Sequence, residues 1–477
     1  MPLSRRDFLS VGLVSGAALC LPRIGLAASS PDASITASTR TLDVRGRAAT
    51  VLSLANRTGG QGLVLDPGAR FSVRVTNKLS EPTLIHWHGQ VPPNEQDGVP
   101  DFPLPALRPG DARDYDYVPE PGTYWMHAHI PLQEMALLAA PLIVRSAEDL
   151  AADRQEVTLF LHDFSFTPPA ELMASLGVGR GMNHATTGGT MGGMAGMTGM
   201  DHGNMSGMMA MDLNDIEFDA YLANDRTLDD PEVVTVDKGG RVLLRVINAA
   251  AATAFWIDLG AAKGSLVAVD GHAVEPVTGS RFPLSMGQRA DIEVGMPADG
   301  AALPVLALRE GAPQRTGIVL APAGTRVARI AEEGALSPPL DLALEARLRP
   351  AEPLAGRAAD KERTLMLGGT MAPYAWTIDG RTFADRRPVT AKSGERVELT
   401  LHNMSMMAHP MHLHGHVFQV VAINGTRFSG ARRDTVLVPP MAAVTIALDA
   451  GEVAEWMFHC HHMPHLQTGM MTTLVVS

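Results

Sequence analysis

The chain has 477 residues, of which 45% are hydrophobic, so it is long enough for roughly two to four domains with cores of their own. Its formal net charge is −12 and no basic run occurs outside the N-terminus, which argues against nucleic acid as a partner. Two features are unusual, namely 26 methionines and 17 histidines that are mostly clustered along the sequence.

The N-terminal segment has the features of an export signal. Arg5 and Arg6 lie in the pattern S-R-R-x-F-L, and a short apolar run and small residues follow. The run is too short to span a bilayer, so it predicts a secretory signal and no membrane anchor. Because paired arginines are typical of twin-arginine signals, residues 1–28 are interpreted as one. Its cleavage removes Cys20 and leaves Cys460 alone, so no internal disulfide is expected.

Three segments align without a gap and indicate three related domains. Each opens with Gly-x-Arg, alternates apolar and polar residues as strands do, and reaches an asparagine at the same offset. The segments are GARFSVRVTNKLSEPTLIHWHG (Gly68–Gly89), GGRVLLRVINAAAATAFWIDLG (Gly239–Gly260) and GERVELTLHNMSMMAHPMHLHG (Gly394–Gly415). Short strands with many Gly and Pro turns predict an all-β fold, and the repeat predicts one β-sandwich per domain.

The predicted first domain, residues 30–148, contains two H-x-H pairs. His86 and His88 end the first repeat, and His127 and His129 follow in YWMHAH. Residues i and i+2 of a strand point to the same face, so each pair directs two imidazoles to one side.

The predicted second domain, residues 155–325, has Ile257 and Leu259 at the positions of the first histidine pair and is therefore interpreted as structural. It carries a Gly/Met-rich insertion at about residues 181–212, which lacks the branched apolar residues of a core. Residues 326–359 are charged and rich in Pro and Ala, which predicts a linker on the surface.

The predicted third domain, residues 360–477, repeats the pattern of the first. His412 and His414 match the first histidine pair, and WMFHCH (Trp456–His461) matches YWMHAH, with Cys460 in the place of Ala128. Four H-x-H pairs on strands predict metal sites that share several ligands.

The type of ligand indicates the metal. Structural zinc sites are closed and often rich in thiolates, whereas one Cys, two His and a weak axial Met describe a blue-copper site. Cys460, His465 and Met470 lie close together in the sequence, and His409 supplies the second imidazole from another strand.

The motifs HWHG, YWMHAH, HPMHLHGH and HCHHMPHLQTGM resemble the four copper-binding motifs of the multicopper oxidases, the family of laccases and bacterial cuprous oxidases. The resemblance implies three cupredoxin-like (Greek-key β-sandwich) domains in one chain and four copper ions. The implied type 1 ligands are His409, Cys460, His465 and Met470. The implied type 2 ligands are His86 and His412. The implied type 3 ligands are His88, His127, His129, His414, His459 and His461.

The resemblance also implies a mechanism. Electrons enter at the type 1 copper and pass through Cys460 and its neighbours His459 and His461 to the three-copper cluster, where dioxygen becomes water. Asp97, nine residues after His88, matches an acidic position near the type 2 copper and is the candidate proton relay, although it also reads as a turn residue in QDG.

A second family carboxylate often follows the last type 1 histidine, but this chain has Leu466 there. Glu452 and Glu455 are the candidate substitutes, and the route of the protons stays open.

The Met-rich insertion is the clue to the reductant. Thioethers select Cu(I), and intervening glycines disfavour a helical core stripe. The candidate ligands of substrate Cu(I) are Met191, Met194, Met197, Met200, Met205 and Met208. A flexible linker of biased composition is the alternative interpretation.

We therefore expect a monomeric oxidase of Cu(I), and more slowly of phenols or aromatic amines, similar to the copper-tolerance oxidases of the bacterial periplasm. A laccase with a phenolic donor is the close alternative. A copper nitrite reductase would need no coupled type 3 pair, and a copper-sequestering protein would need no complete type 1 site.

Overall fold

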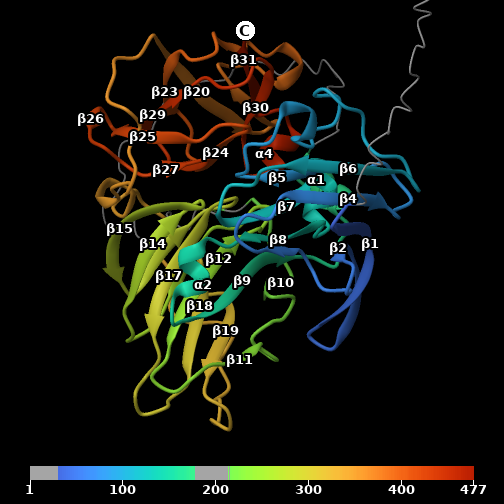
Figure 1. Cartoon of the computed structure of the whole chain (residues 1–477). Coiled ribbons are helices and arrows are strands. Elements are labelled where there is room, and N and C mark those ends of the chain that lie inside the picture. Colours follow the sequence, from blue (N-terminus) through green and yellow to red (C-terminus); the bar gives the residue numbers. More distant parts are fainter. Residues whose placement is uncertain (1–30, 178–212, 214) are drawn as a thin grey trace, which may run out of the picture.

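The computed structural model describes residues 31–177, 213 and 215–477, so the predicted signal segment and the Met-rich insertion with its candidate ligands lie outside the described residues. The described chain forms six β-sheets, arranged as three successive sandwiches (Figure 1), and the predicted all-β class is confirmed. In Figure 1 the third sandwich lies at the top, the second at the bottom and the first beside them.

The first sandwich places a four-stranded sheet against another of the same size. In sheet order, the first consists of β2 (Arg47–Asn56), β1 (Ala33–Val44), β4 (Phe71–Asn77) and β6 (Ala112–Tyr117). The second consists of β3 (Leu63–Leu65), β8 (Ala139–Val144), β7 (Gly122–Ala128) and β5 (Ile85–His88).

The second sandwich joins a six-stranded and a five-stranded sheet. The larger contains β10 (Ala220–Ala223), β9 (Gln155–Phe164), β12 (Arg241–Asn248), β17 (Arg289–Gly295), β14 (Gly264–Val269) and β15 (His272–Gly279). The smaller contains β11 (Val233–Thr235), β19 (Arg315–Ala321), β18 (Leu303–Arg309), β13 (Phe255–Asp258) and β16 (Arg281–Leu284).

The third sandwich joins a seven-stranded and a five-stranded sheet. The larger contains β21 (Tyr374–Ile378), β20 (Lys361–Met371), β23 (Arg396–Asn403), β29 (Ala443–Asp449), β25 (Phe418–Ile423) and β26 (Thr426–Arg427), with β27 (Arg432–Arg433) beside β25. The smaller contains β22 (Val389–Ala391), β31 (Met471–Val476), β30 (Glu455–Cys460), β24 (His409–Leu413) and β28 (Thr435–Val438).

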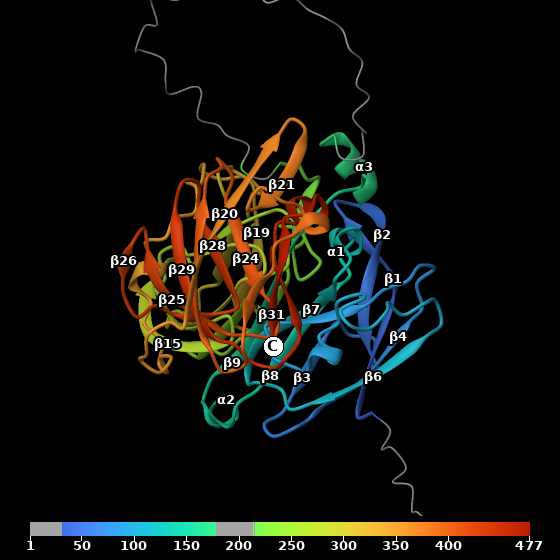
Figure 2. The ribbon, with the colours of Figure 1, turned by 90° about the horizontal axis from the view of Figure 1, so that it is seen from above.

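Helices in the described chain are short and lie between strands. They are α1 (Pro131–Met135), α2 (Ala147–Ala151), α3 (Pro169–Ser175) and α4 (Met463–Gln467). The helices α1 and α4 contact each other and so connect the first and third sandwiches. Figure 2 shows the same elements from above. Among the described residues, no helix has the length and the apolar composition that crossing a membrane would need.

The three aligned segments form equivalent strands, β4, β12 and β23, and their asparagines have one structural role. Asn77, Asn248 and Asn403 are fully buried at the strand ends. Each donates its side-chain amide to two or more backbone carbonyls further along the chain, and its side-chain oxygen accepts the backbone N–H two residues on. A buried amide that is fully paired in this way fixes how the chain turns from one sheet into the other.

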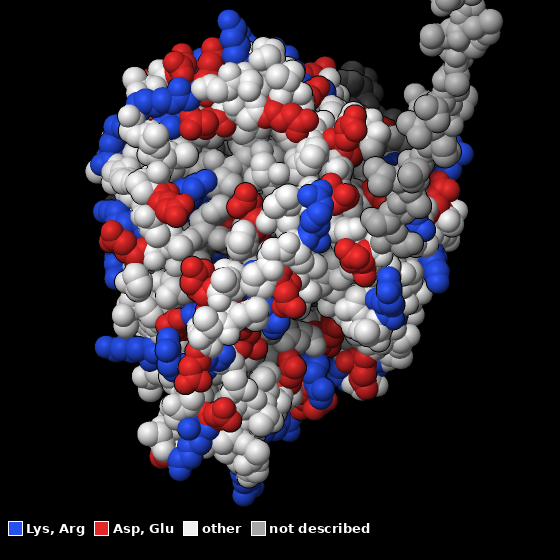
Figure 3. All heavy atoms as spheres, viewed as in Figure 1, with Lys and Arg blue, Asp and Glu red and all other residues white. Residues whose placement is uncertain are grey.

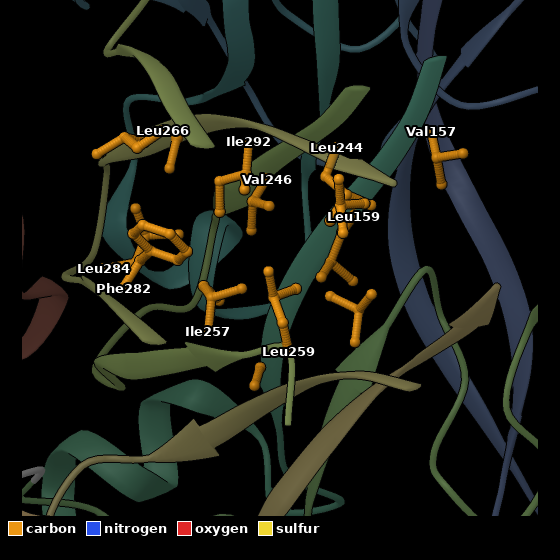
Figure 4. Packing of buried hydrophobic residues seen from close by; sticks show 14 of the residues in the cluster. Val157, Leu159, Leu244, Val246, Ile257, Leu259, Leu266, Phe282, Leu284 and Ile292 are labelled. Carbon is orange, nitrogen blue, oxygen red and sulfur yellow. The ribbon is translucent and has the colours of Figure 1, made fainter. Parts of the chain in front are cut away.

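Each sandwich encloses a hydrophobic core of its own. Figure 4 shows the core of the second, where the inward residues of β12, such as Leu244 and Val246, meet Ile257 and Phe282 from the opposite sheet. Removing branched and aromatic side chains of this size from water is worth about 1.5–3 kcal/mol each, which stabilises the sandwich.

The segment at residues 326–359 has no strand in the structure but is not merely surface chain. Leu348 is fully buried in the second core, and Leu340 and Glu345 are buried as well. On the face of the molecule shown in Figure 3, acidic and basic side chains are interspersed.

Candidate metal centres

Strand register brings the four H-x-H pairs together. In the first sandwich His86 of β5 lies opposite His127 of β7, and in the third His412 of β24 lies opposite His459 of β30. Contacts between the sandwiches, such as the 3.3 Å from Nε2 of His86 to Nε2 of His412, show that the two pairs of strands face one another. Histidines far apart in the sequence therefore line one buried space.

The predicted type 3 ligands separate into two groups of three. His88, His127 and His461 form one group, whose candidate ligand atoms lie within 4.8 Å of one another. His129, His414 and His459 form the other, within the same limit. Both groups contain residues of the first and third sandwiches. The predicted type 2 ligands also come from these two sandwiches, His86 from the first and His412 from the third.

Hydrogen bonds show which ring nitrogens face inward. Nδ1 of His86 donates to the carbonyl of Asp97 (2.8 Å), and Nδ1 of His412 donates to the carbonyl of Asp434 (2.9 Å). A neutral imidazole carries one N–H, so both Nε2 atoms present lone pairs across their 3.3 Å separation. Two facing lone pairs repel unless a cation lies between them, so this pair fits a bound metal.

The same argument holds in the second group of three. Nδ1 of His414 donates to Oδ2 of Asp97 (2.8 Å), and Nδ1 of His459 donates to the carbonyl of Cys460 (3.0 Å). Their Nε2 atoms face each other at 3.0 Å, and Nε2 of His129 lies 3.4 Å from that of His459.

The first group presents nitrogens without partners. Within the described residues, Nδ1 of His88 and Nε2 of His127 and His461 are buried and make no hydrogen bond. Buried polar atoms are nearly always satisfied, so three such nitrogens together indicate a ligand.

The predicted type 1 residues also converge. Sγ of Cys460 lies 3.5 Å from Nδ1 of His465 and 3.7 Å from Nδ1 of His409, and the two nitrogens are 3.2 Å apart. Met470 is fully buried in the same core cluster as Cys460, and its carbonyl accepts the backbone N–H of Cys460. Two imidazoles and one thiol in a closed pocket form a donor set that suits copper.

Burial sets the protonation of these groups. It lowers the pKa of nine of the imidazoles below the ordinary range, which favours the neutral form that binds metals: His88, His127, His129, His409, His412, His414, His459, His461 and His465. Burial also raises the pKa of the Cys460 thiol, so its thiolate needs a cation beside it.

Asp97, which the sequence places in the turn QDG, also lies beside the clustered histidines. Its side chain is 2% exposed, Oδ2 accepts from Nδ1 of His414, and Oδ1 lies 3.3 Å from Nδ1 of His86. Neither Glu452 nor Glu455 has such a position, because they bond to the backbone N–H of Asn94 and to Arg386.

Two buried carboxylates at the histidines were not identified from the sequence. Oε2 of Glu134 in α1 accepts Nδ1 of His127 at 2.7 Å, and its Oε1 lies 3.8 Å from Nδ1 of His461. Oδ1 of Asp434 lies 3.1 Å from Nε2 of His88. Neither lies in a local motif, since α1 and the turn before β28 reach the histidines only through tertiary packing.

A third carboxylate that sequence reasoning missed lies at the type 1 residues. Oδ2 of Asp215 lies 3.2 Å from Nε2 of His465 and accepts the Tyr374 hydroxyl at 2.5 Å. The side chains of Asp215 and His465 are both 0% exposed. Nε2 of His465, the ring nitrogen that points away from Cys460, therefore contacts a buried carboxylate of the second predicted domain.

Comparisons with known proteins identify relatives of the whole chain. Three family models described as multicopper oxidase match residues 36–149, 190–307 and 357–477. Multicopper oxidase MmcO of Mycobacterium tuberculosis is 32% identical over 99% of this chain and 96% of its own length. Copper resistance protein A of Escherichia coli is 26% identical, covering 84% of this chain and 85% of that protein.

The structure of a multi-copper oxidase from Pseudomonas thermotolerans superimposes with a TM-score of 0.69 and 26% identity, over 93% of this chain and 98% of that one. The likeness extends over all three sandwiches.

Proposed function

Because this chain belongs to the multicopper oxidase family, we propose that it is an oxidase whose preferred reductant is Cu(I). The protein is an oxidoreductase with copper as its cofactor, and it couples the oxidation of a small reductant to the reduction of dioxygen to water. With Cu(I) as donor the balance is four Cu(I), one dioxygen and four protons, giving four Cu(II) and two waters.

We assign the copper ligands from the type 1 residues, the type 2 pair and the two groups of three histidines described above. His409, Cys460, His465 and Met470 would hold the type 1 copper, and His86 and His412 the type 2 copper. The type 3 pair would be held by His88, His127 and His461 on one side, and by His129, His414 and His459 on the other. The observation that carries this assignment is the close approach of inward-facing ring nitrogens, which lie 3.0–3.3 Å apart. Bound copper would supply reversible one-electron chemistry and the binding of dioxygen.

Covalent backbone connects the proposed type 1 site, where the reductant is oxidised, to the type 3 groups, where dioxygen is reduced. Cys460 is covalently joined to His459 and His461, and these two belong to different groups of three. A single stretch of backbone therefore joins the type 1 residues to both type 3 groups.

Protons are needed where water forms. We propose that Asp97 delivers them, because its buried carboxylate accepts a hydrogen bond from His414 of one type 3 group and lies 3.3 Å from Nδ1 of His86, which we assign to the type 2 copper.

Exposed thioethers near the type 1 residues support Cu(I) as the donor. Every exposed methionine of the described chain belongs to the third sandwich: Met371, Met404, Met406 and Met441. Backbone bonds from Asn403 to Ala442 and from Met404 to Leu367 bring three of these segments to one end of the sheet. Met404 and Met406 lie in the loop that leads directly into His409.

The burial of the His465 side chain also favours a small ion over an aromatic ring as the electron donor. A phenolic donor, as in a laccase, would need an open edge of the imidazole for contact, whereas the side chains of His465 and Asp215 are fully buried. A metal ion can instead be held by surface thioethers such as those of Met404 and Met406, in the loop that leads into His409. Soft thioether ligands select Cu(I) among the common ions.

Export and copper tolerance belong to the same proposal. A twin-arginine signal at residues 1–28 would deliver the protein to the periplasm as a monomer, where oxidation of Cu(I) would lower its concentration. The relative named copper resistance protein A supports this role.

Rates of oxygen consumption on Cu(I) and on a methoxyphenol test the proposal. The double variant Met404→Ala/Met406→Ala and deletion of residues 188–211 should each lower the rate on Cu(I) severalfold while the phenol rate changes little. Leu336→Ala, which removes an exposed apolar side chain outside this region, is the control. Equal losses on both donors, or none on either, would contradict Cu(I) as the preferred donor.

A further inference from the structure

Arg289, at the start of β17 in the second sandwich, is completely buried beside the histidine groups. Its Nη1 and Nη2 donate to Oδ1 and Oδ2 of Asp434 at 2.8 and 2.5 Å. The guanidinium also donates through Nε to the carbonyl of Thr123 and through Nη1 to that of Gly287, both at 3.1 Å. One side chain thus links a strand of each of the first two sandwiches to a carboxylate of the third.

Asp434 in turn contacts two histidines that we assign to different copper sites. Its Oδ1 lies 3.1 Å from Nε2 of His88 and 3.3 Å from Nδ1 of His412. These nitrogens carry the ring protons if they donate to the carboxylate, so Nδ1 of His88 and Nε2 of His412 are left as lone pairs. In the described chain Nδ1 of His88 has no hydrogen-bond partner, and Nε2 of His412 faces His86.

Close packing leaves this arrangement little freedom. A Cβ atom on Gly89, the glycine of HWHG, would lie 2.2 Å from Nη2 of Arg289 and 2.6 Å from Oδ2 of Asp434. A Cβ on Gly287 would lie 3.1 Å from ring atoms of both His88 and His461. Backbone of the second sandwich therefore packs directly against the rings, although that sandwich contributes no histidine to the three groups in the described chain.

We propose that Arg289 is a positioning residue for the oxygen-reducing site, and that through Asp434 it holds His88 and His412 in the orientation that retains the type 2 copper and one type 3 copper. The proposal rests on the ligand assignment given above. It makes the second sandwich, which contributes no ligand to the proposed type 1, type 2 and type 3 sites within the described residues, a determinant of copper retention.

The chemistry of arginine explains why this residue is required. Its planar fork contacts both carboxylate oxygens and two carbonyls at once, which the single ammonium of lysine cannot do. Without Arg289, Asp434 would be a buried carboxylate that has lost its bidentate partner, and its position would no longer be fixed. Outer partners of metal-binding histidines typically change metal affinity by about 10–100-fold when they are replaced.

Arg245 provides a matched control. It also lies in the larger sheet of the second sandwich, is 1% exposed and contacts Thr123, donating to its hydroxyl at 3.0 Å. Its ion pairs, however, run to Glu156, Asp291 and Asp149. Loss of Arg245 should therefore disturb the sandwich without releasing copper.

The experiment compares Arg289→Lys and Arg289→Gln with the same changes at Arg245, all loaded with copper. Copper per chain, the electron paramagnetic resonance signal of type 2 copper and the blue absorption of the type 1 site are measured during dialysis against a chelator. We expect both Arg289 variants to lose the type 2 signal at roughly 10–100-fold lower chelator concentration than the wild type. The blue absorption should persist, and both Arg245 variants should keep four coppers.

Two outcomes would overturn the inference: unchanged retention in the Arg289 variants, or equal loss of type 2 copper in the Arg245 variants. Failure of the ligand assignment is distinguishable, because then the wild type itself would not show four coppers with one type 2 signal. If the single variants do not fold, Arg289→Gln/Asp434→Asn removes both charges and keeps an oxygen acceptor for the two rings. That pair should fold, retain the blue absorption and release type 2 copper more readily than the wild type, and retention equal to the wild type would overturn the inference.

Discussion

Cys460 lies between two histidines that serve different groups, while its own side chain faces the opposite way. Alternation along β30 and the residue after it places Sγ against His409 and His465, and the flanking imidazoles in the type 3 groups. Burial raises the pKa of this thiol, so only a bound metal ion would stabilise the thiolate. In the proposed assignment, the cysteine is therefore an inert buried thiol without copper and a ligand with it.

Replacing Cys460 by serine should remove the proposed type 1 site and leave the oxygen-reducing site in place. Cys460→Ser keeps the size of the side chain but removes the soft thiolate, so we expect the blue absorption and turnover to be lost while the fold and the type 2 signal remain. Absorption, circular dichroism and copper analysis measure this. A variant that still turns over would contradict the proposed route, and Ala128→Ser at the matching position of the first sandwich is the control.

Sequence patterns identified the histidines but not their supporting carboxylates. The H-x-H spacing carries its own geometric meaning on a strand, so His127 and His459 could be recognised without a structure. Glu134, Asp215 and Asp434 are single acids in unremarkable contexts, and packing between sandwiches alone brings them to the rings. Glu134 is the clearest case, since it lies at the type 3 histidines in a chain that has Leu466 where the family often has an acid.

Among the elements, the turn between β18 and β19 holds the segment that follows the second sandwich. Oε1 of Glu310 accepts the backbone N–H of Leu340 at 2.5 Å, and both residues are buried. Burial raises the pKa of Glu310 to about 7, while the bond from Leu340 acts in the opposite direction.

This carboxyl predicts a specific pH dependence. The pKa of Glu310 is higher in the folded state than in the unfolded state, so the folded state keeps its proton to a higher pH. The contribution of Glu310 to the free energy of unfolding is therefore most favourable below about pH 4.5. It falls by about 3 kcal/mol as the pH rises to about 7. Glu310→Gln stays neutral and keeps an oxygen for Leu340. The difference in unfolding free energy between variant and wild type, measured with urea on copper-loaded protein, should therefore grow in favour of the variant over this range. Parallel curves would contradict the assignment.

The repeated elements were predictable where the sequence repeats itself. Asn77, Asn248 and Asn403 occur at one offset and have one role, so alignment of the segments located equivalent strands. The segment at residues 326–359 was less predictable, because its composition is that of a surface linker. Burial of Leu348 in the second core depends on a groove that exists only after the sandwich has folded.

At the scale of the whole molecule, copper and tertiary structure support each other. Each group of three histidines contains members of the first and third sandwiches, so copper bound as proposed would join the two. A ligand present at 1,000 times its dissociation constant adds about 4 kcal/mol to folding stability.

Removal of copper should therefore lower the melting temperature, and readdition should restore it. Calorimetry of the same preparation before chelation, after chelation and after reloading measures this. Reloading with Zn²⁺ instead of copper controls for the general effect of a divalent ion. An unchanged melting temperature on complete copper removal would contradict a bridging role.

The distribution of ligands along the chain also has a consequence for biosynthesis. His86 and His412 are 326 positions apart, and both groups of three require residues near the C-terminus. A ribosome-bound chain that has reached only the second sandwich holds four of the ten histidines of the proposed copper sites and no complete site, so premature termination would give a protein that cannot activate oxygen. The long separation in sequence delays reactive chemistry until synthesis is essentially finished.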